Sequence, residues 1–213
     1  MSSSGTSPDH RQTLLLFGAG GHGRVVGDAA LLTDQWREIM ASDGNPSFCR
    51  GALIAGISLR PVEAARALSG PLHVAIGSNT AREREASAWG HDRLVSIIHP
   101  AATVSASSHV GAGCFLAAGS VTAPGAVLAA GVIINHGAVV DHDAQVGAFS
   151  HIAPHATLGG GAVIGQRVLV GSGAVVLPLM RVADDVVIGA GAVVAAPITQ
   201  AGTYAGVPAR RIA

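Results

Sequence analysis

The sequence holds few aromatic residues, few charged residues and no long hydrophobic run. Aromatic residues make up 3% and charged residues 12% of the 213 residues, and every one of the 13 basic residues is arginine. The formal net charge is zero and the basic residues cluster only at Arg210-Arg211, so electrostatic binding to nucleic acid is not expected. No apolar run approaches the roughly 18 residues that a membrane-spanning helix needs, so no membrane partner is expected.

The cysteine content is also low. Cys49 and Cys114 are spaced neither as a metal site nor as a redox motif, so we expect two free thiols and a cytoplasmic protein. The N-terminus lacks the basic and apolar segments of a signal peptide. Residues 1–12 are rich in Ser and are predicted to form a disordered tail.

What the sequence does contain is a period of six residues. From Ile98 to Val194, every sixth residue is Val, Ile or Leu, with Thr122 as the exception. Strands repeat every two residues and helices every 3.6, so neither produces this period alone. A second stripe of mostly small residues lies four positions further on, at Ala102, Ser108, Cys114, Ser120, Ala126, Ala138, Ala144, Ser150, Ala156, Ala162, Ala174 and Ala192. Such hexads are typical of a left-handed parallel β-helix, in which three short rungs form one triangular coil.

The preceding segment, residues 13–97, lacks the hexads and alternates strand-like with helix-like stretches. Strands are predicted at 13–17, 38–42, 52–57, 73–76 and 94–97, and helices at about 25–31, 61–68 and 80–89. The expected fold is therefore a small Rossmann-like α/β domain at 13–97, followed at 98–213 by a left-handed β-helix of hexapeptide repeats with a C-terminal extension.

A glycine-rich loop follows the first predicted strand. Gly18, Gly20 and Gly23 match G-x-G-x-x-G between a strand and a helix, where backbone and helix N-terminus can bind a phosphate. Asp43 stands twenty residues beyond Gly23, where dinucleotide-binding units carry a ribose-binding acid. The domain is only about half a complete dinucleotide fold, so a mononucleotide half fits better. A purely structural tight turn is the alternative.

One histidine lies between two acids in a region with few charges. Asp141 and Asp143 flank His142, and a neighbouring carboxylate raises the pKa of a histidine and fixes its tautomer, as a general base requires. A solvated corner of the β-helix is the alternative. Zinc needs ligands that converge on one point, and no two histidines of the repeats are eighteen residues apart, so no metal is expected.

Six segments in this order resemble a known family. They are the loop from Gly18 to Gly23, Val74 to Asn79, Ile98-His99-Pro100, Ile134-Asn135 to Asp141-His142-Asp143, Phe149-Ser150-His151, and Ala205 to Arg210. Together they resemble the sugar acyltransferases of the sialic-acid O-acetyltransferase type. This family includes the nucleotide-sugar N-acetyltransferases that make diacetamido-bacillosamine and N-acetyl-perosamine.

The resemblance implies a homotrimeric, acetyl-CoA-dependent N-acetyltransferase for surface glycan biosynthesis. The expected acceptor is a nucleotide-linked 4-amino-4,6-dideoxy sugar, and acetyl-CoA is the co-substrate in a groove between two β-helices. By the same resemblance, His142 is the general base, and Asp143 is the carboxylate that raises the basicity of His142. The remaining implied contacts are His151, Ser172 and Ala190 for acetyl-CoA, Gly20, Gly21, His22, Asp43 and Gly77 for the nucleotide, and Asn135 for the acceptor.

The chain departs from the family pattern at two places. Relatives carry Glu where Asp143 stands, so either Asp141 or Asp143 can be the carboxylate partner of His142. Relatives also carry an acid where Ser42 stands beside Asp43, so the identity of the bound nucleotide is left undecided. The alternatives are O-acetylation of a sugar hydroxyl, as in sialic acid, and a non-enzymatic nucleotide-binding scaffold. No Ser or Cys with a base partner is evident, so direct transfer in a ternary complex is expected.

Overall fold

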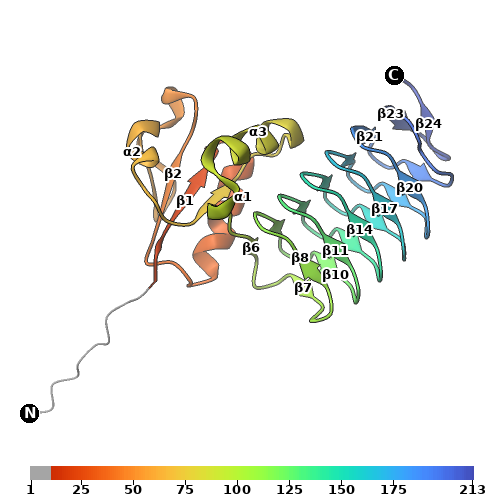
Figure 1. Cartoon of the computed structure of the whole chain (residues 1–213), viewed down its shortest axis with the longest axis horizontal. Coiled ribbons are helices and arrows are strands. Elements are labelled where there is room, and N and C mark those ends of the chain that lie inside the picture. Colours follow the sequence, from red (N-terminus) through yellow and green to blue (C-terminus); the bar gives the residue numbers. More distant parts are fainter. Residues whose placement is uncertain (1–10) are drawn as a thin grey trace, which may run out of the picture.

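The computed structural model describes residues 11–213 (Figure 1). A small α/β domain lies beside a stack of triangular coils, and the C-terminus lies at the far end of the stack. Residues 1–10, which carry most of the predicted tail, lie outside the described residues. In residues 11–213, no helix has the length and apolar character that crossing a membrane requires.

The N-terminal domain has a five-stranded sheet in the order β3-β4-β2-β1-β5. Its elements are β1 (Thr13–Phe17), α1 (Gly21–Leu32), β2 (Glu38–Ser42), the 3-10 turn η1 (Pro46–Phe48), β3 (Ala52–Ile54), β4 (Ile57–Leu59), α2 (Val62–Arg66), β5 (Leu72–Val74), α3 (Asn79–Trp89) and the 3-10 turn η2 (His91–Arg93). The pairings β1·β2, β1·β5 and β2·β4 are parallel, as the βαβ order predicts.

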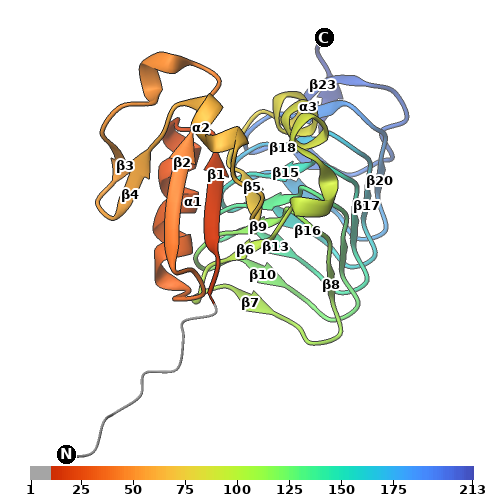
Figure 2. The ribbon, with the colours of Figure 1, turned by 60° about the vertical axis from the view of Figure 1, so that its left-hand side comes forward.

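Two predicted strands of this domain are wrong in detail. The predicted strand 52–57 is instead the antiparallel hairpin β3–β4, which turns at Gly56 with φ 89° and lies at the outer edge of the sheet (Figure 2). The predicted strand 94–97 is not a strand of this sheet. Leu94 makes one isolated bridge to Leu72, and the chain then enters β6 (Ile97–Ile98), which pairs with the β-helix.

The repeats form a three-sided prism whose parallel strands stack at intervals of eighteen residues. Face 1 contains β6, β9 (Phe115–Leu116), β12 (Ile133–Ile134), β15 (His151–Ile152), β18 (Leu169–Val170), β21 (Val186–Ile188), β23 (Gly202–Ala205) and β24 (Arg210–Arg211). Face 2 contains β7 (Thr103–Val104), β10 (Val121–Thr122), β13 (Val139–Val140), β16 (Thr157–Leu158), β19 (Val175–Val176) and β22 (Val193–Val194). Face 3 contains β8 (His109–Val110), β11 (Val127–Leu128), β14 (Gln145–Val146), β17 (Val163–Ile164) and β20 (Arg181–Val182).

The aliphatic and small stripes fill the interior of this prism. Residues from Leu116 to Val194 on the aliphatic stripe are buried, and the small residues lie beside them in one apolar cluster. The expected inward orientation fails at the open end, where Ile98 is 37% exposed because no coil lies below it. The left-handed β-helix is therefore confirmed as the fold of the repeat region.

The corners of the prism use left-handed backbone at a regular position. The third residue after each aliphatic one, from Gly113 to Gly191, has positive φ. Glycine adopts this conformation at low cost, whereas other residues are strained there. Six corners nevertheless carry a side chain at this position: Asp143, Phe149, His155, Arg167, Leu179 and Asp185.

The N-terminal domain packs on face 1. Val26 and Ala29 of α1 share a buried cluster with Phe115 and Ile133 of that face. The helix α3 packs near the corner between faces 3 and 1, where Trp89 and Phe149 belong to one buried cluster. These two contacts place the carboxyl ends of β1 and β5 against the middle coils.

Candidate functional site

His142 and Asp143 form a pair at the corner between faces 2 and 3. Asp143 Oδ2 accepts a hydrogen bond from His142 Nδ1 at 2.9 Å, and both side chains are exposed. Asp143 is one of the residues with positive φ (58°), and this backbone turns its carboxylate toward the ring. The neighbouring Asp141 instead accepts from the backbone N–H of His142 at 2.7 Å. In the structure, therefore, Asp143 is the carboxylate bonded to the ring.

This pair has the electrostatics of a general base. The hydrogen bond that His142 donates to Asp143, reinforced by the charge of Asp141, raises the pKa of His142. Since Nδ1 donates to Asp143, the neutral ring carries its lone pair on Nε2, where it is free to accept a proton. Nε2 lies over Gly160 in the next coil, and a β-carbon on Gly160 would lie only 2.5 Å from that nitrogen.

A second histidine, His151, lies on face 1 against the N-terminal domain. Asn135 Nδ2 lies 3.0 Å from His151 Nε2, and Asn135 Oδ1 accepts from the backbone N–H of His136. The amide NH₂ therefore faces the ring, and Nε2 accepts. The nearby backbone carbonyl of Gly77 favours the charged ring, yet burial and the charge of Arg82 lower the pKa of His151 to about 4. His151 is thus neutral near pH 7.

The glycine loop lies at the N-terminus of α1, beside this second histidine. A β-carbon at Gly20 or Gly21 would meet no atom within 4 Å, so packing within the chain does not require glycine at either position. At Gly23 a β-carbon would strike the carbonyl of Gly18, so this glycine lets α1 approach β1 closely. The first turn of α1 carries no acidic residue and no side-chain cap, so its N–H groups are free for an anion.

Asp43 and His22 complete this end of the site. Asp43 Oδ2 accepts from the backbone N–H of Ala19 at 2.7 Å, and its Oδ1 accepts from Asn45, so the carboxylate braces the loop. The ring of His22 meets Phe115 edge-on at a centroid distance of 5.4 Å and lies 6.3 Å from the ring of His151. Burial, followed by the neighbouring His151, lowers the pKa of His22 to about 3.

A groove of about 470 Å³ opens beside His151 and is lined by Gly77, Ser78, Asn79, Thr80, Arg167, Leu169, Asp185 and Val187. Ser172 and Ala190 lie outside it, exposed at the corner between faces 1 and 2 in successive coils, where Ser172 accepts from the N–H of Gly191. In residues 11–213, no group of three or more His, Cys, Asp or Glu side chains could hold a metal ion.

Comparison with known proteins decides the family. The family described as the PglD N-terminal domain matches residues 13–88. The acetyltransferase domain of PglB from Neisseria gonorrhoeae superimposes with a TM-score of 0.87 at 36% identity, over 94% of this chain and 100% of that one. The chain belongs to the hexapeptide-repeat sugar N-acetyltransferases.

Two further structures of relatives contain ligands. The same Neisseria gonorrhoeae domain has been solved with acetyl coenzyme A, and it matches at TM-score 0.87 and 36% identity over 95% of this chain and 100% of that one. A mutant perosamine N-acetyltransferase from Caulobacter crescentus, solved with CoA and GDP-perosamine, matches at TM-score 0.86 and 31% identity over 94% and 97%. A search of the curated protein sequences finds no significant match.

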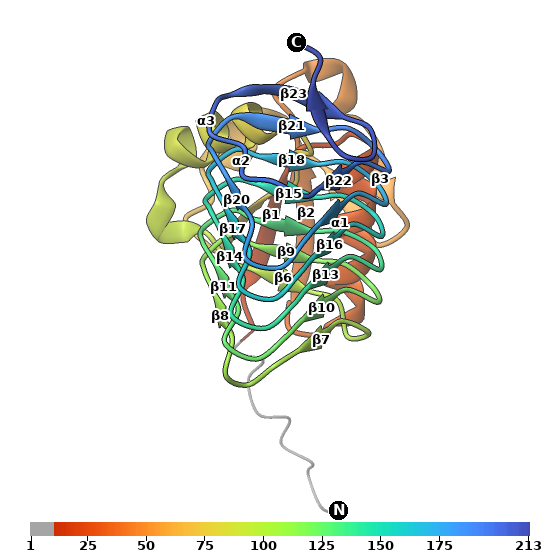
Figure 3. The ribbon, with the colours of Figure 1, turned by 90° about the vertical axis from the view of Figure 1, so that its right-hand side faces the viewer.

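In this sugar N-acetyltransferase the predicted site residues fall into separate groups. Gly20, Gly21, His22, Asp43, Gly77, Asn135 and His151 lie where the N-terminal domain meets face 1. His142 and Asp143 lie on the corner between faces 2 and 3, which is the edge of the prism that does not border face 1 (Figure 3). One chain of the acetyltransferase therefore does not bring its proposed base to its own glycine loop.

The sequence analysis missed two residues that the structure places in or beside this machinery. Gly160 lies against His142 from the next coil, and a signal was available, since it is the middle of three glycines eighteen residues after Asp141-His142-Asp143. Arg82 is 1% exposed and lies behind Gly77 and His151. It stands among the charged residues Glu83, Arg84 and Glu85 of α3, so the sequence pattern does not distinguish it.

Proposed function

We propose that this chain is an acetyl-CoA-dependent N-acetyltransferase whose acceptor is a nucleotide-linked 4-amino-4,6-dideoxy sugar used for a surface glycan. The observation that carries the proposal is the His142–Asp143 pair, an exposed imidazole whose pKa is raised and whose free Nε2 points over bare backbone. The complexes of its relatives with acetyl coenzyme A and with GDP-perosamine support the choice of co-substrate and acceptor. The compartment proposed is the cytoplasm.

In the proposed reaction, His142 acts in a ternary complex. The amine nitrogen of the sugar attacks the thioester carbonyl and forms the C–N bond, and His142 Nε2 removes the proton that the nitrogen loses. The C–S bond then breaks, and the protonated ring returns the proton to the leaving thiolate. Asp143 holds the ring in the tautomer that leaves Nε2 free and stabilises the imidazolium, a contribution of about 10²–10⁴-fold for the base as a whole.

The nucleotide end of the acceptor is proposed to bind at the glycine loop. Gly20 and Gly21 leave room for a phosphate at the free N–H groups of α1, while Asp43 braces the loop and His22 and Gly77 border it. Asn135 and His151 are proposed to contact the sugar and the thioester end of acetyl-CoA. Ser172 and Ala190, which are exposed and lie on successive coils, are proposed to line the groove for the extended co-substrate.

A homotrimer is proposed because the site is otherwise incomplete. His142 lies across the prism from the glycine loop of its own chain, whereas a neighbouring prism can present its face 2–face 3 corner to the face 1 side of this one. A cyclic arrangement repeats this heterologous contact three times and closes. Each site would then combine His142 of one subunit with the glycine loop and His151 of the next.

Thiol release from acetyl-CoA tests the function directly. The purified protein is incubated with acetyl-CoA and, in separate assays, with UDP-, dTDP- and GDP-linked 4-amino sugars and free sialic acid. The masses of the products are measured by mass spectrometry. We expect turnover with one amino sugar and a product that resists hydroxylamine, as an amide does. Turnover of sialic acid to a hydroxylamine-sensitive ester would establish O-acetylation instead. Thiol release with no member of the panel would contradict the proposed acceptor.

A further inference from the structure

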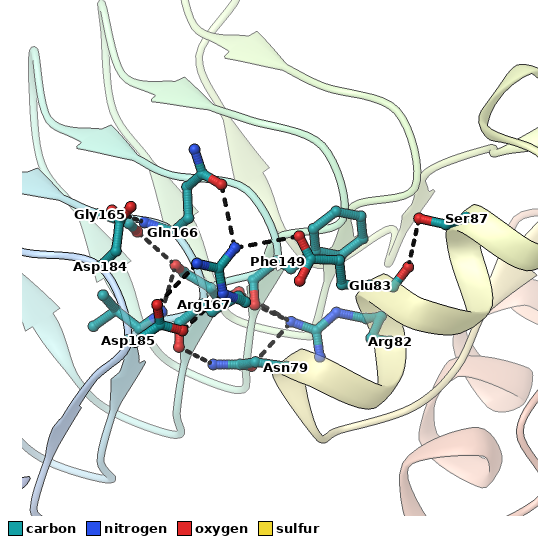
Figure 4. A network of polar contacts seen from close by, with 12 residues as sticks. Asn79, Arg82, Glu83, Ser87, Phe149, Gly165, Gln166, Arg167, Asp184 and Asp185 are labelled. Atoms are coloured by element: carbon teal, nitrogen blue, oxygen red, sulfur yellow. Dashed lines mark hydrogen bonds and ion pairs between the residues drawn. The ribbon is translucent and has the colours of Figure 1, made fainter. Parts of the chain in front are cut away.

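Arg82 is a buried cation at the junction between the two domains. Its side chain leaves α3 and is 1% exposed (Figure 4). The guanidinium donates to the carbonyl oxygens of Ile76 at 2.8 Å and Gly77 at 3.1 Å, within the N-terminal domain. It also donates to the β-helix, at 2.8 Å to the carbonyl of Gly131 and at 2.7 Å to that of Phe149.

No carboxylate contacts Arg82 among residues 11–213. The neighbouring Glu83 instead pairs with Arg167, which also forms a two-pronged ion pair with Asp185 at 2.7 and 2.8 Å (Figure 4). A buried charge without a counterion is costly unless polar groups surround it. Backbone carbonyls and the Asn79 side chain, at 3.1 Å, provide this environment for Arg82.

The carbonyls that Arg82 holds belong to the segments that fix His151. Phe149 has positive φ (57°) at the corner that leads through Ser150 into His151, so its carbonyl turns toward the guanidinium. The carbonyl of Gly77, on the opposite side, accepts from Arg82 and lies near the His151 ring, where it favours the charged form of the ring. One side chain therefore anchors the turn before His151 and a carbonyl beside its ring.

We propose that Arg82 is a positioning residue for acetyl transfer: its guanidinium ties the Ile76–Gly77 turn to the Phe149–Ser150 corner and thereby holds the His151 ring between Gly77 and Asn135. A planar group with five N–H donors suits this task, because it reaches five backbone carbonyls at once, that of Ser150 at 3.4 Å included. The kinetic part of this inference rests on the proposed function. The geometric part concerns the ring of His151 and does not depend on any substrate.

The expected state of the ring follows from its surroundings. Besides Arg82 on α3, the groups that face His151 are His22 on α1, Asn135 beside β12, and Arg167 and Asp185 at the groove. Burial, reinforced by the charge of Arg82, keeps the ring neutral, and Nε2 accepts from Asn135. Without the guanidinium, the cationic form becomes easier to reach and the Gly77 carbonyl loses its anchor, which frees the ring to change tautomer and orientation.

The test compares Arg82→Met and Arg82→Lys with two controls on the same helix. Nitrogen-15 NMR of the imidazoles reports the tautomer and pKa of His151, whose signal is assigned by its loss in His151→Gln. In Arg82→Met we expect the pKa of His151 to rise toward its ordinary value, its Nδ1–H tautomer to become mixed with the Nε2–H form, and kcat to fall by about tenfold to a hundredfold. Arg82→Lys keeps the positive charge but loses the planar guanidinium with its several N–H donors. This variant should lower kcat while leaving the His151 ring largely neutral.

The controls distinguish a role of Arg82 in positioning the His151 ring from a general role in attaching α3 to the β-helix. Glu83→Gln removes an ion pair between α3 and the β-helix, and Arg84→Met removes an exposed arginine whose side chain, among residues 11–213, bonds to its neighbour Glu85. Both should leave the His151 signal and kcat unchanged. If Arg82→Met does not fold, the test rests on Arg82→Lys. A folded Arg82→Lys protein with the wild-type His151 tautomer and wild-type kcat would overturn the proposal. A changed His151 signal in a protein that acetylates no sugar would refute the proposed function and leave the positioning intact.

Discussion

The Nε2 atom of His142 lies over the α-carbon of Gly160 in the next coil, where any β-carbon would lie 2.5 Å from that nitrogen. The contact spans eighteen residues and makes the glycine part of the site, because only bare backbone leaves the imidazole in its position. Gly125 plays the corresponding role one coil below, where a β-carbon would lie 2.5 Å from Asp143 Oδ1. His142 and Asp143 thus each lie against a glycine of an adjacent coil.

We therefore expect Gly160→Ala to displace the ring and to lower kcat by about tenfold or more without unfolding the prism. Thermal melting and steady-state kinetics measure both effects. The matched control is the same change in a His142→Ala background, where the added methyl group meets no ring and should cost less stability. An equal loss of stability in both backgrounds would show that the methyl group clashes with something other than His142.

The second prediction concerns pH. His142→Ala should lower kcat by about 10²–10⁴-fold, whereas a solvated corner histidine predicts wild-type activity. Because Asp143 raises the pKa of His142, the base loses its proton only at a higher pH, and Asp143→Asn should move the acidic limb of the pH–rate profile to lower pH. Asp141→Asn should move it less, since Asp141 acts through charge alone. The reverse order would identify Asp141 as the working partner.

Three histidines with lowered pKa values, of which His73 is fully buried and His22 and His151 are partly buried, predict that acid destabilises the fold. Burial lowers the pKa of His22 to about 3 and those of His73 and His151 to about 4, so these rings stay neutral in the native state while the unfolded chain binds protons below pH 6.5. Stability is therefore undiminished by these rings above pH 6.5 and falls as the pH drops toward 4, by about 3 kcal/mol for His73. Urea unfolding across this range should show the decline. His73→Asn should flatten it, and an unchanged slope would contradict the neutral buried ring.

The fourth prediction tests the shared site. His142→Ala and Gly21→Val subunits, each inactive alone, should regain activity when they are refolded together. Random mixing in a cyclic trimer pairs an intact base with an intact glycine loop at about a quarter of the sites. Light scattering should give three times the subunit mass of 21.1 kDa. No recovery in mixed trimers would mean that each site is built within one chain.

The fifth prediction separates the binding of the two substrates. Gly21→Val places a side chain where a β-carbon meets no protein atom within 4 Å, so the free protein should fold normally. The side chain should instead block the phosphates and raise the acceptor KM strongly. Calorimetry without acceptor should show unchanged acetyl-CoA affinity. Tight binding of NAD by the wild type, or loss of acetyl-CoA affinity in the variant, would contradict this division.

Sequence patterns predicted the fold well where the information is local and repeated. The six-residue period reports the interior of the prism directly, because each aliphatic residue meets the same environment one rung later. The hairpin at β3–β4 was missed, since the run from Ala52 to Ile57 reads as one apolar strand unless Gly56 is taken as a turn with positive φ. Likewise, the sequence pattern assigns Ile97 to the last strand of the first domain, whereas in the structure Ile97 pairs with Phe115 of the β-helix.

The contacts within the candidate site could be predicted where the residues are neighbours in the chain or match a motif, and the roles of these residues stay predictions. Asp143 is adjacent to His142, so its contact could be anticipated. The contacts of Gly160 with His142 and of Arg82 with Phe149 join residues that are 18 and 67 positions apart, and only the stacking of coils and the docking of α3 bring them together. One unused signal exists: Asp143, Phe149, Arg167 and Asp185 break the run of corner glycines, and each takes part in the site or in the junction between the domains.

Because the stacking interval is constant, the number of residues between two positions fixes how far apart they lie along the prism. Ile133 pairs with His151 because one coil takes eighteen residues, and each coil adds about 4.8 Å along the axis. Insertion of eighteen residues before Asp141 would move the His142–Asp143 pair by one such step along the same edge, whereas insertion of six would carry it to a different edge. The position of this pair along the prism can therefore change only by whole coils if the pair is to stay on its edge.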